Sequence, residues 1–185
     1  PLSLYPASMH RSFLVIVMTL LLGMSAGNAA DGERIDTHVH LAFLAGKKKT
    51  DFGKEEYAAA AKDLIALMEK HGVTKVLVLP PPNARSTPQT GVGDYADFID
   101  AIGKYPDRLA LGAGGGLLNP MIHETAADRV TPAIRAEFEK RAKDIITHGA
   151  KGFGEMTALH LSEQEGQPFE AVSPDHPLFL LLADI

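Results

Sequence analysis

The stretch Val73-Thr-Lys-Val-Leu-Val-Leu-Pro80 is a nearly continuous apolar run that ends at a proline. Strands of a parallel sheet are covered on both faces and carry such runs, whereas strands with one solvated face alternate apolar and polar residues. We therefore expect residues 73–80 to form a buried parallel strand. Parallel neighbours are joined by long crossovers, so helices should lie on both sides of this strand in the sequence.

Helices and strands alternate along the chain around this run. Apolar residues at helical spacing predict three helices, at residues 54–71, 95–102 and 132–148. Short apolar runs predict three more strands, at residues 35–40, 108–113 and 150–156. A long polar loop should then lead to an apolar helix at residues 177–185. Four βα units in a row predict an α/β fold, a parallel sheet wrapped by helices.

The N-terminal residues have the composition of an export signal. Residues 1–8 precede the first Met and are expected to be an upstream extension. Residues 9–30 combine a positive start at Met9-His10-Arg11, an apolar run and small residues near Ala30, as a signal peptide does. The apolar run is shorter than the roughly 20 residues of a membrane-spanning helix, and an uncleaved anchor is the alternative. Cleavage would leave residues 31–185 without stable membrane association.

Composition narrows the cellular setting and the partners. The chain has no Cys, which excludes disulfides, thiolate metal ligands and a Cys nucleophile. An export signal without Cys fits a bacterial periplasmic enzyme better than a small disulfide-stabilised secreted domain. The net charge of −5 disfavours nucleic acid as a partner, because phosphate binding needs a basic surface.

Two histidines stand one residue apart at the end of the first predicted strand, Arg34-Ile-Asp-Thr-His-Val-His40. Side chains alternate along a strand, so His38 and His40 project from the same face, roughly 6–7 Å apart. Two imidazoles placed in this way can bind one divalent metal ion. A chance His-x-His on an exposed strand is the alternative. Asp36 lies on the same face and would support the histidines from the second coordination shell.

Three motifs together resemble the amidohydrolase superfamily: Ile35-Asp-Thr-His-Val-His40, Tyr105-Pro-Asp-Arg-Leu109 and Gly152-Phe-Gly-Glu155. The likeness is nearest to the amidohydrolase-related (amidohydrolase 2) branch, which holds hydrolases, lactonases and metal-dependent decarboxylases. The resemblance implies that residues 31–185 are the N-terminal half of a TIM-like (β/α)8 barrel. A whole barrel needs about 250 residues, so we expect this one to be truncated. A flavodoxin-like five-strand sheet is the alternative fold.

The resemblance also implies a ligand set. Glu155 ends the fourth predicted strand, level with the histidines that end the first, and resembles a metal ligand of the family. The alternative for Glu155 is a carboxylate at the barrel mouth that only orients a neighbour. One or two divalent ions are expected, with zinc as the first choice. The remaining ligands and the proton-transferring Asp would come from later strands, so this half holds no further catalytic residue.

Other polar residues are weaker candidates. His160 and Arg85 lie on loops at the expected catalytic face and would bind substrate, although an exposed loop Arg is more often simply solvated. His71 and His148 precede glycines at predicted helix ends. A cation is stabilised at the carbonyl end of a helix, so a structural role is the expectation for both.

Two histidines and one glycine run have no predicted chemical role: His123, His176 and residues 112–116. The two histidines fall on polar loops with no evident partner. The glycine run resembles a phosphate loop only loosely, and tight packing at a strand end explains it better.

The sequence therefore predicts a metal-dependent hydrolase that cleaves a C–N or C–O bond in a small-molecule substrate by metal-activated water. A metal-dependent non-oxidative decarboxylase would use the same histidines and is the first alternative. An exported, non-catalytic binding protein on a barrel scaffold is the second.

We expect residues 31–185 alone to be inactive and poorly soluble. Half a barrel exposes two open sheet edges and an apolar helix, and unpaired edges favour aggregation. Size-exclusion chromatography and an activity assay test this expectation. A monodisperse, active preparation would contradict it.

Overall fold

The computed structural model describes residues 32–41, 53–82, 94–161 and 169–185. The chain divides into two compact units, Pro1–Glu33 and Arg34–Ile185, and all the elements below belong to the second unit. The predicted signal peptide, the upstream extension and Arg85 lie outside the described residues. None of the helices in the described ranges combines the length and the apolar character that crossing a membrane requires.

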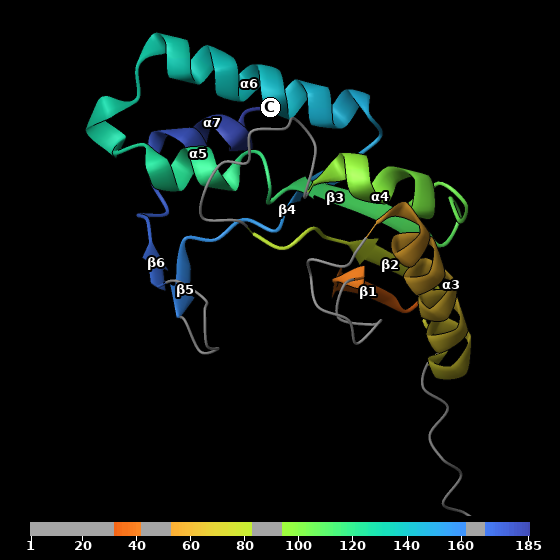
Figure 1. Ribbon diagram of the computed structural model, residues 1–185. Coiled ribbons are helices and arrows are strands. Elements are labelled where there is room, and N and C mark those ends of the chain that lie inside the picture. Colours follow the sequence, from red (N-terminus) through yellow and green to blue (C-terminus); the bar gives the residue numbers. More distant parts are fainter. Residues whose placement is uncertain (1–31, 42–52, 83–93, 162–168) are drawn as a thin grey trace, which may run out of the picture. The chain divides into compact units, whose positions relative to one another are not determined.

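Four parallel strands form the central sheet in the order β1-β2-β3-β4 (Figure 1). Their bounds are Ile35–Val39 for β1, Lys75–Val78 for β2, Leu109–Gly114 for β3 and Gly152–Gly154 for β4. Each strand pairs with the next one along the chain, as in the first half of a (β/α)8 barrel. A flavodoxin-like sheet would place its first strand between the second and third, so that alternative is wrong for these strands.

Helices fill the connections between the strands. The first two are α3 at Lys54–His71, between β1 and β2, and α4 at Tyr95–Ile102, between β2 and β3. The connection from β3 to β4 holds α5 (Asn119–Glu124), a 3-10 turn η2 (Ala127–Arg129) and α6 (Pro132–Thr147). The last helix, α7, spans Pro177–Ala183. The sequence did not predict α5, because six residues are too few to establish a helical period.

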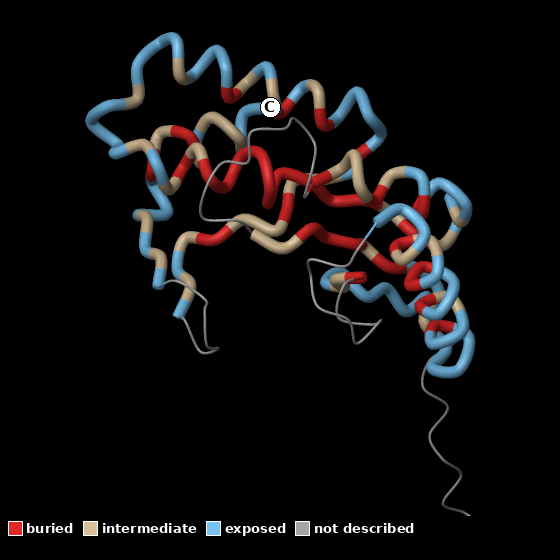
Figure 2. Tube along the Cα trace, in the orientation of Figure 1, coloured by how far each residue is buried: buried red, intermediate tan, exposed pale blue. Residues whose placement is uncertain are grey.

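The apolar stripes predicted on the helices are buried against one face of the sheet (Figure 2). On α3, Tyr57, Leu64 and Met68 are buried, and on α6 Phe138 and Ile145 are fully covered. They join a core with strand residues Val76, Val78, Leu109 and Leu111. The α/β architecture is thus confirmed, and the burial of these stripes fixes which face of the sheet the helices cover.

Two histidines lie at helix ends, as the sequence predicts: His71 is the last residue of α3, and His148 directly follows α6. The residue after α3, Gly72, has a positive φ of 65°, which terminates the helix in the left-handed conformation. At the end of α6, the Nδ1 of His148 donates to the carbonyl oxygen of Asp144 at 2.7 Å. The same carbonyl also accepts the backbone N–H of His148 at 3.0 Å, so the imidazole adds a second donor at the end of the helix.

The prediction of a long polar loop after β4 is wrong in part, because two short strands form there. The strands β5 (Leu159–Leu161) and β6 (Phe169–Ala171) pair antiparallel, with His160 opposite Glu170. Each strand has three residues in an apolar-polar-apolar order, which is the period of a strand but too short a run to stand out from a loop.

We expect Phe98→Ala to lower the free energy of unfolding by about 3–5 kcal/mol. The Phe98 side chain is 1% exposed, and its ring lies 4.5 Å from the ring of Tyr57, so its loss opens a cavity between α4 and α3. Leu67→Ala on the exposed face of α3 is the control, and it should cost less than about 1 kcal/mol. Denaturant unfolding followed by circular dichroism measures both. Equal losses for the two variants would contradict this account of the core.

Candidate metal centre

Three side chains from the ends of two strands converge on one point. His38 lies in β1, His40 follows directly after it, and Glu155 follows directly after β4. The two imidazole Nε2 atoms are 3.1 Å apart. The Oε2 of Glu155 lies 3.0 Å from the Nε2 of His40 and 3.4 Å from that of His38. The three residues form a possible metal-binding triad.

The meeting of β1 with β4 requires a curled sheet. Two strands separate them in the sheet order, so in a flat sheet they would lie about 14 Å apart. Side-chain atoms 3.0–3.4 Å apart can come only from strands whose carboxyl ends bend towards each other. The triad therefore lies at the end of the sheet where (β/α)8 barrels carry their active sites.

A hydrogen bond sets the orientation of His40. Its Nδ1 lies 2.9 Å from the carbonyl oxygen of Leu79, which can only accept, so Nδ1 carries the hydrogen. The neutral ring then has its lone pair on Nε2, directed at the triad. The His40 side chain is 12% exposed and that of His38 is 55% exposed, so one histidine is fixed by the protein and the other faces solvent.

Asp36 contacts the histidine pair through the backbone. Its Oδ1 accepts a hydrogen bond from the backbone N–H of His38 at 3.0 Å. Asp36 therefore supports the backbone at the end of β1. The sequence predicted support of the imidazole rings instead, so the prediction differs from the observed contact.

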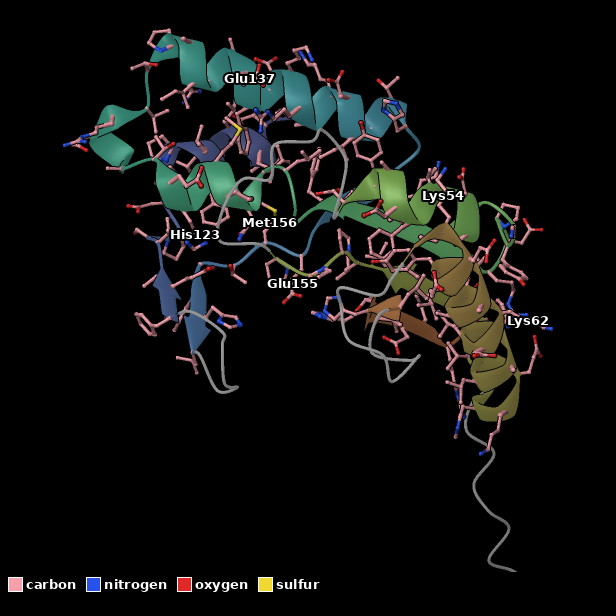
Figure 3. The ribbon with its side chains drawn as sticks, in the orientation of Figure 1. Lys54, Lys62, His123, Glu137, Glu155 and Met156 are labelled. Carbon is pink, nitrogen blue, oxygen red and sulfur yellow. The ribbon has the colours of Figure 1, made fainter. Side chains whose placement is uncertain are left out.

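Glu155, labelled in Figure 3, is held by hydrogen bonds of its own backbone and of Thr157. Its backbone N–H donates to the carbonyl oxygen of Pro80 at 3.3 Å. Two residues later, the N–H and hydroxyl of Thr157 both donate to the side-chain oxygen of Asn119, at 2.9 and 3.3 Å. The Nε2 of His123 donates to the Thr157 carbonyl at 2.8 Å. These anchors limit the movement of Glu155 relative to β2 and α5.

The placement of two histidines on loops without partners was wrong. His123 lies in α5 and bonds to Thr157, as described above. His176 is the N-cap of α7 and is 3% exposed. Its Nδ1 accepts from the N–H of Leu178, and its Nε2 donates to the carbonyl of Thr125 at 2.8 Å. Both rings therefore act as structural hydrogen-bonding groups. This role could not be predicted from the sequence without knowing that α5 contains His123 and that α7 starts after His176.

The distances within the triad fit a divalent ion. Ligands about 2.0–2.1 Å from a tetrahedral zinc lie about 3.3–3.4 Å from one another, and neighbouring ligands around an octahedral ion about 2.9 Å. The separations of 3.0, 3.1 and 3.4 Å between the ligand atoms of the triad lie within the range that these two geometries span. Two imidazole nitrogens and one carboxylate oxygen are donors that zinc and non-haem iron accept, and three protein ligands leave room for water or substrate.

The glycine run at residues 112–116, which includes the end of β3, is buried and packs tightly. A Cβ atom at Gly112 would lie 2.5 Å from Cδ2 of Leu79, and one at Gly154 would lie 3.0 Å from the same atom. The backbone N–H groups of Gly114, Gly116 and Leu117 donate to the carboxylate of Asp94 at 2.8–3.0 Å. The run therefore binds a side chain of its own chain, in agreement with packing as its explanation.

Sequence reasoning missed Asp94, which is fully buried before α4. Burial raises the pKa of the Asp94 carboxyl above its usual value, and the four backbone N–H groups that donate to it oppose this rise. The signal for Asp94 was present, because an Asp directly before a predicted helix is a common N-cap.

The other predicted residues are not part of the triad. His160 lies in β5 opposite Glu170, and its role in substrate binding stays a prediction. Lys151 is exposed and lies before β4, at the strand end away from Glu155, as its position in the sequence indicates.

Comparison with protein-family models, with curated proteins and with solved structures finds no match for this chain. The resemblance to the amidohydrolase superfamily therefore rests on the three motifs alone and stays a prediction. The geometry of the triad is independent of that resemblance.

We expect His40→Ala to weaken zinc binding by at least about 100-fold, because removing even an outer hydrogen-bond partner of a ligand costs roughly 10–100-fold. Competition with a chromophoric chelator measures the affinity of the full-length protein. His71→Ala is the control, since His71 ends α3 outside the triad, and it should leave the affinity unchanged. Equal affinities for the His40 variant and the wild type would rule out His40 as a ligand.

Proposed function

We propose that this protein is a metal-dependent hydrolase that cleaves a C–N or C–O bond in a small-molecule substrate, with zinc as the expected ion. The observation that carries the proposal is the convergence of His38, His40 and Glu155 at the carboxyl ends of β1 and β4. Such an ion, when bound, lowers the pKa of water at the site and polarises a substrate carbonyl.

The side chains of the triad have separable tasks in this proposal. His40 presents its Nε2 lone pair because Leu79 holds the hydrogen on Nδ1. Glu155 contributes the negative charge that two neutral imidazoles lack. His38 stands on the open side of the site, where its exposed ring leaves a path for substrate. Binding, orientation and charge are thus supplied by residues of the described chain.

The family resemblance extends the proposal but does not carry it. It assigns further ligands and a proton-transferring Asp to later strands, and no Asp joins the triad in the described part of the chain. Export to the bacterial periplasm stays a prediction from residues 9–30.

Metal removal tests the proposal most simply. After dialysis against a strong chelator, the full-length protein should lose at least about 100-fold of its hydrolysis rate on a panel of amides, esters and lactones, and added zinc should restore it. The double variant His38→Ala/His40→Ala should be equally inactive after zinc is added, whereas His71→Ala should respond to chelator and zinc as the wild type does.

The reaction products and their dependence on metal distinguish the hydrolase from the decarboxylase. Release of an acid with an amine or alcohol supports the hydrolase, and metal-dependent release of carbon dioxide from an aromatic acid would replace it by the decarboxylase. Unchanged activity in the metal-free protein and in the double variant would overturn both.

A further inference from the structure

One short piece of backbone supports both halves of the triad. The Leu79 carbonyl accepts from the ring of His40, and the next carbonyl, that of Pro80, accepts from the backbone N–H of Glu155. The N–H of Leu79 donates to the carbonyl of Val39 at 2.9 Å, which joins this segment to β1. The distance from His40 to Glu155 therefore depends on where the backbone of residues 79–81 lies relative to the end of β4.

Gly115 fills the space between these two strand ends. A Cβ atom at this position would lie 2.8 Å from the carbonyl oxygen of Pro81, 3.0 Å from that of Pro80 and 2.9 Å from that of Glu155. All three atoms belong to the backbone, so no side-chain rotation could relieve the contact. A larger residue at this position has to separate the end of β2 from the end of β4.

Asp94 holds Gly115 in this place. Its two carboxylate oxygens accept from the N–H groups on both sides of Gly115, those of Gly114 and Gly116, and from that of Leu117. It also accepts from the N–H of Tyr95 at 2.8 Å, which joins the turn to the start of α4. The turn that carries Gly115 is thus fixed by a buried carboxyl group that accepts hydrogen bonds from four backbone N–H groups.

We propose that Gly115 and Asp94 are positioning residues of the metal centre: Gly115 sets the separation of the β2 and β4 ends, and Asp94 fixes the turn that carries Gly115. Neither residue touches the triad's ligand atoms. The inference rests on the proposed metal site, and it predicts that metal affinity depends on the absence of a single Cβ atom at Gly115.

The test compares Gly115→Ala with Gly152→Ala in the full-length protein. Gly152 lies in β4, three residues before Glu155, and a Cβ atom there meets nothing within 4 Å. Zinc affinity is measured by competition with a chromophoric chelator, and the ligand geometry by the visible absorption of the cobalt-loaded protein. Gly115→Ala should bind zinc about 10–100-fold more weakly, with shifted cobalt bands, and Gly152→Ala should match the wild type.

Two further variants separate positioning from general stability. Ile145→Val, in the fully buried core of α6, should lower the melting temperature without changing the zinc affinity or the cobalt spectrum. Asp94→Asn turns an amide N–H2 towards backbone N–H groups, and it should weaken zinc binding in the same direction as Gly115→Ala. If Gly115→Ala does not fold, the zinc affinity of Asp94→Asn tests the positioning role by itself.

The outcomes distinguish this inference from the proposed function. If the wild type binds neither zinc nor cobalt, the metal site itself is wrong. If the wild type binds both ions, and folded Gly115→Ala and Asp94→Asn keep its affinity and its cobalt spectrum, then the positioning role is wrong and the metal site stands. Loss of affinity in Ile145→Val equal to that in Gly115→Ala would also overturn the positioning role.

Discussion

The candidate site depends on two carbonyl groups, those of Leu79 and Pro80, which lie just beyond β2. Residues 80–82 are all proline and lack the N–H that a strand needs to continue its ladder, so β2 ends at Val78. The two carbonyls are then available to accept from the ring of His40 and the backbone of Glu155. Because β2 ends at Val78, His40 after β1 and Glu155 after β4 can both bond to the backbone of residues 79–80.

The rest of the fold keeps that support in place. The helices α3, α4 and α6 bury one face of the sheet and leave the carboxyl ends of its strands free to carry polar groups. The curl of the sheet brings the end of β4 towards β1, and glycines at 112, 115 and 154 allow the backbones and the Leu79 side chain to approach closely. Asp94 and Asn119 complete the arrangement. Asp94 accepts from backbone N–H groups of the turn that follows β3, and Asn119 accepts from the buried N–H of Thr157.

Much of the fold was predictable because it follows from periodicity. The apolar stripe of α3 and the run at residues 73–80 each determine a secondary structure without reference to distant residues. The pair His38 and His40 was equally visible, since alternation along a strand is a local rule. The partners of His123, the role of Asp94 and the hairpin of β5 and β6 were not, because they depend on contacts between residues 20 to 34 positions apart or on strands of three residues. Glu155 lies between these cases: its place at a strand end was predictable, but its distance from the histidines depends on the curl of the sheet.

The most direct measurement is the position of a zinc ion in crystals of the full-length protein, located by anomalous diffraction at the zinc absorption edge. We expect one strong peak about 2.0–2.2 Å from the Nε2 atoms of His38 and His40 and from a carboxylate oxygen of Glu155. A zinc ion bound elsewhere, for instance between His123 and Glu170, whose Nε2 and Oε2 atoms lie 3.7 Å apart, with the triad unliganded at saturating zinc, would contradict it.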